Sequence, residues 1–168
     1  MTKDDILNIA VWRNSDELEF KCFVPVFEKS VSVQILTKDK ECISDSSVQI
    51  VNNLLGLSAQ QLETIKNYLW EDCKLNCEIS DYGFDVPEGK TEQEVNHKEF
   101  GVFNGEDAYE KSDLQYLLIS EADRDVYTNH YGLLTFDNEW NSHLTEVVMK
   151  NGDIVGYGDS GSYLGKYE

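Results

Sequence analysis

The order of the apolar patterns along the chain constrains its fold more than any other feature. Segments rich in β-branched and aromatic residues, typical of strands, occur near both ends of the chain, over residues 8–12, 18–27, 30–36, 114–120, 126–136 and 144–150. Helical patterns occur between these two groups. Strands and helices therefore do not alternate as they do in βαβ units. We predict an α+β fold in which two helices pack on a largely antiparallel β-sheet.

Two helices are expected in the middle of the chain. The first covers residues 47–55 and ends at Gly56, a residue common just past helix ends. The second begins after Ser58, which forms a capping-box pattern with Gln61. Its apolar stripe, which we expect to be buried against the sheet, consists of Leu62, Ile65, Leu69 and, one turn on, Cys73.

Three local signals refine the strands. Asn151-Gly152 separates two apolar runs and predicts a type I′ β-hairpin. Pro25 indicates an edge position or the end of a strand. Trp140 follows a strand-like run and is either an exposed anchor for a partner or a core residue that caps the sheet. We favour the core position.

Residues 78–113 have a different character from the rest of the chain. They hold eleven carboxylates and three lysines, a net charge of −8, with little apolar periodicity. We interpret them as a long, acidic and partly irregular excursion of a single domain that spans residues 1–168. Connections of this length are usually functional or disordered.

The charge of the whole chain limits its partners. Thirty-two Asp and Glu residues face fourteen Lys and Arg residues, for a formal net charge of −18. A small domain needs a net charge of only about 2–8 to stay soluble. The excess argues against direct binding to nucleic acid or to an anionic membrane, and it favours a basic partner. A general solubility surface is the alternative explanation.

The location of the protein is expected to be the cytoplasm. The first residues are acidic and no apolar signal segment follows them, and the longest apolar runs are too short to cross a membrane. The four cysteines should then be reduced thiols. Cys73 and Cys77 share a face of the second predicted helix, but their spacing differs from the C-x-x-C of zinc and redox sites. We expect buried thiols and no metal.

No catalytic template is complete in this sequence. Gly-Asp-Ser-Gly at 158–161 is similar to the segment around the nucleophile of chymotrypsin-like proteases, but nothing else in the chain matches them. Asp123-Arg124-Asp125 lacks the glycine and glutamate of an EF-hand loop. The three histidines, His97, His130 and His143, are scattered. We therefore expect no catalytic residue, no cofactor and no enzyme activity, and a small enzyme is the least favoured alternative.

The last third carries a resemblance to a known family. The residues concerned are the run YGLLTFDNEW at 131–140, then Leu144, Val147-Val148, Asn151-Gly152 and a final glycine-rich stretch. They resemble a family of small acidic bacterial domains of uncharacterised type, associated with polymorphic-toxin and contact-dependent-inhibition immunity. The resemblance implies an immunity protein that binds and neutralises a cognate toxin domain, expected to be basic and of the nuclease type.

The excursion is the segment most expected to bind such a partner. An acidic adaptor or a nucleic-acid mimic, whose acids imitate phosphate spacing, is the alternative function, and a solvated loop is the alternative interpretation of the excursion. Charge density selects the candidate partner-binding residues Glu92, Glu94, Glu99, Glu106, Asp107 and Glu110.

Overall fold

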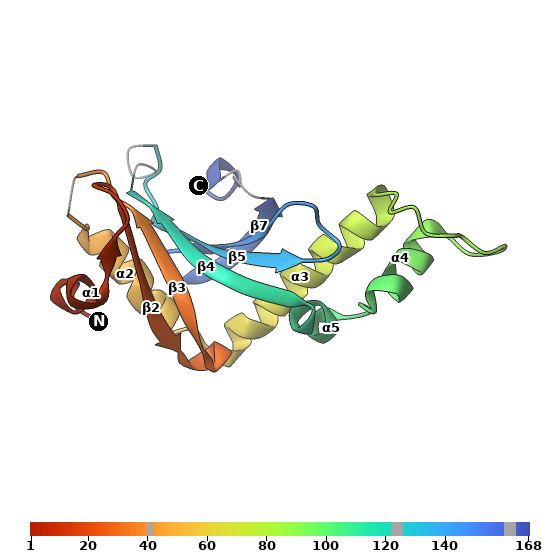
Figure 1. Ribbon diagram of the computed structural model, residues 1–168, viewed down its shortest axis with the longest axis horizontal. Helices are drawn as coiled ribbons and strands as arrows, with labels where there is room; N and C mark the ends of the chain where they lie inside the picture. Colours follow the sequence, from red (N-terminus) through yellow and green to blue (C-terminus); the bar gives the residue numbers. More distant parts are fainter. Residues whose placement is uncertain (40–41, 122–125, 160–163) are drawn as a thin grey trace.

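The sheet follows the order of the chain. The computed structural model describes residues 1–39, 42–121, 126–159 and 164–168 (Figure 1). Within them, strands pair in the order β1-β2-β3-β4-β5-β6-β7. Their bounds are Val11–Trp12, Glu17–Val24, Lys29–Leu36, Ser112–Ser120, Tyr131–Asn138, Thr145–Lys150 and Asp153–Asp159. All neighbouring pairs are antiparallel except β3 and β4, which are parallel. The α+β prediction is confirmed.

Four helices lie in the connection between β3 and β4, where a parallel pair requires a long crossover. They are α2 (Asp45–Leu55), α3 (Ala59–Ile79), α4 (Glu92–Phe100) and α5 (Gly105–Glu110). Helices α2 and α3 cover one face of the sheet, and α3 continues past its edge (Figure 1). Short 3₁₀ helices cover Pro25–Phe27 and Leu164–Lys166. No helix among the described residues is long and apolar enough to cross a bilayer.

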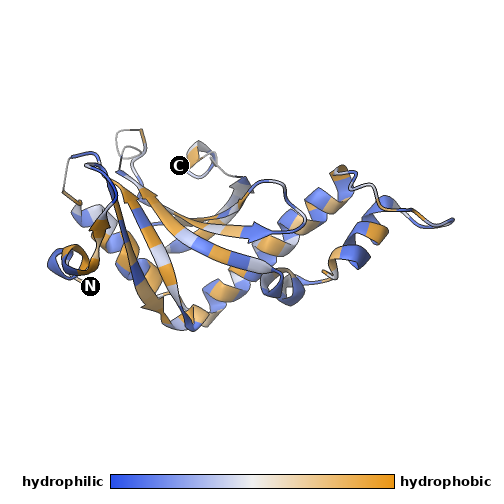
Figure 2. Ribbon diagram, in the orientation of Figure 1, coloured by the Kyte–Doolittle hydropathy of each residue, from blue (hydrophilic) through white to orange (hydrophobic). Residues whose placement is uncertain are grey.

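The core lies between the sheet and these two helices. Ile65 and Leu69 are fully buried on α3, as their spacing predicts, whereas Leu62 is only partly buried. Ser58 caps α3 and forms the expected box with Gln61. Figure 2 shows hydrophobic residues along the strands and at intervals along the helices. The core side of α3 is therefore predictable from the sequence, with Leu62 at its margin.

The strand ends follow the predicted turn chemistry. Asn151 and Gly152 have φ angles of 50° and 99°, the left-handed conformation that a type I′ turn requires, and they join β6 to β7. Strand β2 ends at Val24, and Pro25 begins the 3₁₀ helix that follows. Strand β5 begins at Tyr131, five residues later than predicted.

The N-terminal prediction was wrong. A strand was expected over residues 8–12, but Lys3–Ile9 form helix α1 and only Val11–Trp12 pair in the sheet. Thr2 and Asp5 form a capping box at the start of α1, and Ile6 is fully buried in the core. These contacts outweigh the β propensity of the apolar residues that follow.

The acidic excursion is more regular than expected. Its irregular part is the connection between α3 and α4, and most of the remainder is helical. Thr91 begins α4 with a capping box to Glu94, and Gly101 ends it with a φ of 67°. Asn104 caps α5. The capping residues Thr91 and Asn104 and the glycine at the end of α4 are therefore the local features that mark these helices, because apolar periodicity does not.

Candidate functional site: an acidic arm

The most distinctive surface of the molecule is a projecting arm. We use the name acidic arm for residues 70–103, which comprise the distal half of α3, the connection that follows, α4 and the residues after it. The arm extends beyond the edge of the sheet (Figure 1). It contains nine carboxylates and three lysines, a net charge of −6. It is therefore both the most projecting and one of the most acidic parts of the protein.

Hydrogen bonds hold α4 to α3. The buried side chain of Asn96 donates from Nδ2 to the carbonyl oxygens of Cys77, at 3.0 Å, and Ser80, at 3.2 Å. These bonds satisfy carbonyls at the end of α3 that have no helical partner. The arm is thus held by contacts of its own and does not depend on the sheet along its whole length.

Aromatic rings fill the space between the connection and α4. The ring of Tyr82 contacts that of Phe100 edge to face, with centroids 4.9 Å apart, and Phe84 lies 5.8 Å from Phe100. The Tyr82 hydroxyl donates a hydrogen bond to the carbonyl oxygen of Trp140. This last contact ties the arm to the end of β5.

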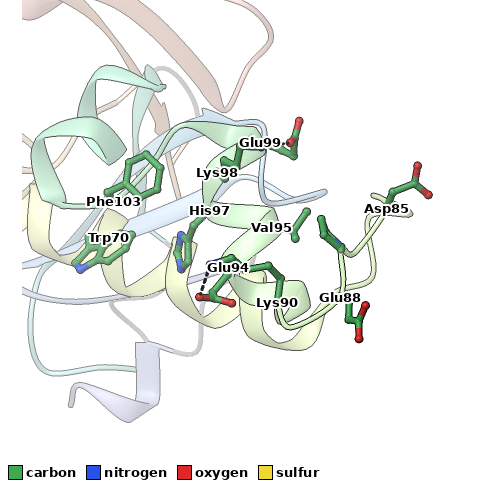
Figure 3. Close-up of a pocket in the computed structure, with 11 residues that line it drawn as sticks. Trp70, Asp85, Glu88, Lys90, Glu94, Val95, His97, Lys98, Glu99 and Phe103 are labelled. Carbon is green, nitrogen blue, oxygen red and sulfur yellow. Dashed lines mark hydrogen bonds and ion pairs between the residues drawn. The ribbon is translucent and has the colours of Figure 1, made fainter.

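A groove of about 680 Å³ runs along the arm. Figure 3 shows Trp70 and Phe103 at one end, and Asp85 and Glu88 at the other. Its apolar and aromatic lining comes from Trp70, Pro87, Val95 and Phe103, and its charged lining from Asp85, Glu88, Lys90, Glu94, Lys98 and Glu99. A partner that fills this groove would meet an apolar floor between carboxylates and lysines.

Several apolar side chains of the arm are exposed to solvent. Ile79 is 69% exposed, Phe103 58% and Val86 42%. Single exposed apolar residues are ordinary on protein surfaces, but a group of them on one projecting element is typical of an interaction site. The arm therefore combines apolar contact area with charge.

The structure divides the six predicted binding residues between two helices. Glu92, Glu94 and Glu99 lie on α4, and Glu94 and Glu99 line the groove. Glu106, Asp107 and Glu110 lie on α5, outside the groove lining. The prediction treated the six residues as one surface, whereas only two of them, Glu94 and Glu99, line the groove.

Three of these carboxylates also stabilise the local structure. Glu94 accepts a hydrogen bond from the backbone N–H of Thr91 and pairs with Lys90 at 3.2 Å, which together lower its pKa. Asp107 accepts from the N–H of Phe103 at 3.0 Å, and Glu106 pairs with Lys66 of α3 at 2.5 Å. Replacing these residues would alter folding as well as charge.

Sequence reasoning missed several lining residues. Trp70 follows Leu69 of the predicted apolar stripe of α3, but it lines the groove. Val95 and Phe103 give a weak signal, because both lie in a segment that contains few apolar residues. Glu88 was overlooked because charge density alone cannot select among eleven acids.

A second cluster lies beside the groove, and one of its members, His97, is part of the groove lining. Cys73 and Cys77 of α3 are fully buried, and their sulfur atoms are 3.9 Å apart. His97 of α4 approaches them with its Nδ1 4.0 Å from the Cys73 sulfur. Burial lowers the pKa of His97, although the hydrogen bond with the Val102 carbonyl opposes this shift. His97 looked isolated in the sequence, and the fold brings it to two thiols.

All four cysteines, including Cys22 and Cys42, are free thiols. Trp140 is 1% exposed, which confirms the core position. Asp123-Arg124-Asp125 and the second half of the Gly-Asp-Ser-Gly segment, Ser160-Gly161, lie outside the described residues.

Comparison with known proteins gives a family without a known role. Residues 3–164 match the family described as Domain of unknown function (DUF6985). No curated protein and no solved structure matches the chain.

Proposed function

The chain belongs to the family described as Domain of unknown function (DUF6985), and we propose that it is an immunity protein that binds and neutralises a basic toxin domain through its acidic arm. The observation that supports this most strongly is the arm itself, which projects from the sheet and exposes apolar side chains among carboxylates. The C-terminal resemblance to immunity-associated domains names the kind of partner.

Charge would guide the encounter. A net charge of −18 attracts a basic protein and raises its association rate by roughly 10–10³-fold. This attraction weakens with salt, because the Debye length is only about 8 Å at physiological ionic strength. A nuclease-type toxin holds phosphates with Lys and Arg, and the arm's carboxylates would occupy those same side chains.

Apolar contacts would hold the complex once formed. Interfaces commonly have a desolvated aromatic centre and a polar rim. Phe103 and Trp70 at one end of the groove can supply that centre, and Glu88 and Glu99 can supply the rim. The two kinds of residue thus have separable effects on dissociation and association.

The test is a rate measurement with a basic toxin domain, taken from the gene directly upstream of this chain's gene if that gene encodes a large toxin. The variant Glu88→Gln, Glu92→Gln, Glu99→Gln removes three exposed charges from the arm. Of these, Glu88 and Glu92 have no ion-pair partner within the described residues. We expect the association rate constant at low salt to fall by roughly tenfold, and less at moderate salt.

A matched control removes three exposed charges elsewhere. Asp4 lies on α1, at the opposite end of the molecule from α4, and Asp16 and Asp39 lie in connections next to β2 and β3. Asp4→Asn, Asp16→Asn, Asp39→Asn should change the rate much less than the arm variant. Equal effects of the two variants would show that only total charge matters. Absence of binding by the wild type, or of protection of cells that express the toxin, would reject the proposed function.

A further inference from the structure

Three metal-ligating side chains converge between α3 and α4. Cys73 and Cys77 are one helical turn apart and point to the same side of α3, with their sulfurs 3.9 Å apart. His97 completes the group from α4, and one ligand atom from each of the three lies within 4.8 Å of the other two. Two thiols and an imidazole form a donor set typical of zinc sites.

The distances fit a tetrahedral ion. Zn–S bonds of about 2.3 Å and Zn–N bonds of about 2.0–2.1 Å place ligand sulfurs about 3.8 Å apart, and sulfur and nitrogen about 3.6 Å apart. The corresponding separations here are 3.9 Å between the sulfurs and 4.0 Å between the Cys73 sulfur and Nδ1 of His97. The third separation, between the Cys77 sulfur and the His97 ring nitrogen, is no more than 4.8 Å, so side-chain movements of up to about 1 Å would bring the three ligands to bonding geometry.

We propose that Cys73, Cys77 and His97 form a binding site for a thiophilic divalent cation, of which Zn²⁺ is the physiological candidate. Two thiolates and one imidazole supply three ligands. His97 is only partly buried and lines the groove, so solvent has access to the site from that side. A water molecule from the groove fills the fourth position.

Binding changes the hydrogen bonding of His97. The ring Nδ1 lies 3.0 Å from the carbonyl oxygen of Val102, to which a neutral ring donates its proton. Coordination through Nδ1 replaces that hydrogen bond, and the ring proton moves to Nε2 on the other side. The two thiols release their protons when they bind the ion, so each ion bound liberates about two protons to the buffer.

The position of the site gives it a structural consequence. Its ligands come from both helices of the acidic arm, and Asn96, next to His97, already bonds to the Cys77 carbonyl. A bound ion would add a direct link between α3 and α4 beside the groove. It would therefore stabilise the arm whether or not the arm binds a toxin.

The probe for the test is Co²⁺, which reports tetrahedral thiolate coordination by its absorption. Metal-free, reduced wild-type protein is titrated with Co²⁺, and Zn²⁺ is then added. We expect one equivalent of Co²⁺ to bind, with a thiolate-to-metal charge-transfer absorption whose intensity corresponds to two thiolate ligands. Added Zn²⁺ should displace the Co²⁺ and remove this absorption. Absence of saturable binding, or absorption without charge transfer, would overturn the proposal and leave the cluster as packed thiols.

Variants assign the ligands. Cys73→Ser and Cys77→Ser should each abolish the charge-transfer absorption of the two-thiolate site, and His97→Asn should weaken binding by about tenfold or more. Cys22→Ser and Cys42→Ser are the matched controls, because they lie outside the cluster and should leave binding unchanged. Loss of binding in these controls, with retention in Cys73→Ser, would overturn the assignment.

A thermal measurement on the same proteins is independent of the spectra. Zn²⁺ should raise the Tm of the wild type and of Cys22→Ser, because an ion that binds only the folded state stabilises it. It should leave the Tm of Cys77→Ser unchanged. Equal stabilisation of wild type and Cys77→Ser would contradict the site even if Co²⁺ binds.

Discussion

The indole Nε1 of Trp140 donates a 2.9 Å hydrogen bond to Oδ2 of Asp72, a carboxylate on α3 that is 2% exposed. The hydroxyl of Thr145 donates to the same oxygen at 2.8 Å. Trp140 follows β5, and Thr145 begins β6. The carboxylate therefore joins the end of the sheet to the helix from which the acidic arm extends.

Asp72→Ala should destabilise the protein strongly. The change leaves the buried indole N–H and the Thr145 hydroxyl without their acceptor, at a cost of about 2–4 kcal/mol in the free energy of unfolding. Urea denaturation measures it. In a double-mutant cycle with Trp140→Phe, the losses of unfolding free energy from the two changes should not add, because both changes remove the same hydrogen bond, between Trp140 and Asp72. Additive costs would show that the bond contributes nothing.

Asp72 should also give the stability a recognisable pH dependence. Burial raises its pKa, and the hydrogen bonds from Trp140 and Thr145 offset this only in part. The folded state then holds the proton more tightly than the unfolded chain, whose Asp pKa is about 3.9. Ionisation therefore lowers stability as the pH rises from the unfolded to the folded pKa.

Asp72→Asn removes this titration and isolates its effect. The free energy of unfolding of the wild type, relative to the Asn variant, should decrease as the pH rises from about 3 towards neutrality. Denaturation curves for both proteins at a series of pH values provide the comparison. A relative gain in wild-type stability over that range would mean that the hydrogen bonds outweigh burial and that the pKa is lowered.

Two positions on α3 should differ in their sensitivity to truncation. Ile65→Ala should cost about 2–5 kcal/mol, because Ile65 is fully buried in the core. Leu62→Ala should cost less, since Leu62 is only partly buried. If both variants lost the same free energy of unfolding, Leu62 would contribute to the core as much as Ile65 does and would not lie at its margin.

Glu121 should be sensitive to the loss of its charge. Its carboxylate is buried, and Oε1 accepts hydrogen bonds from the Ser44 N–H at 2.7 Å and the Ser47 hydroxyl at 2.6 Å, near the start of α2, while Oε2 accepts one from the Lys38 N–H at 3.2 Å. In Glu121→Gln an amide N–H₂ replaces one of the two acceptor oxygens. We expect a loss of about 1–3 kcal/mol and a lower Tm, and Glu110→Gln, an exposed change, serves as the control. An unchanged Tm in Glu121→Gln would contradict this role.

Phe103→Ala should separate apolar from charged contributions to partner binding. The side chain is 58% exposed and lies at one end of the groove, so its removal should change the folding stability by less than about 0.5 kcal/mol. If it anchors the toxin, the dissociation rate constant should rise by roughly tenfold or more while the association rate constant stays the same. A change confined to association would assign Phe103 to steering and not to the interface centre.

Local chemistry made much of the fold predictable. The Ser58–Gln61 capping box, the Ile65 and Leu69 spacing and the Asn151-Gly152 turn each act within a few residues, and each is found where expected. Helix α4 begins with the Thr91–Glu94 capping box, but it lacks an apolar stripe because its sequence is mostly polar. It is held by Asn96, whose partners are backbone carbonyls of another helix that no sequence pattern reveals.

The sites depend on contacts between distant residues. The acidic excursion was recognisable from its charge, but the division of its carboxylates between α4 and α5 follows from their packing against α3. Cys73 and Cys77 were recognisable as a pair on one face. The place of His97 beside them required knowledge of how α4 folds back on α3.

The single parallel pairing, between β3 and β4, has a consequence for the folding pathway. Strands β1 to β3 and strands β4 to β7 can each form by local antiparallel pairing, whereas Ser32 meets Tyr116 only after the whole helical segment between them is closed into a loop. Closing such a loop costs chain entropy before the contact repays it. Joining of the two half-sheets is therefore expected to be the slow step, and α2 and α3, which pack across both halves, to be the surface on which they meet.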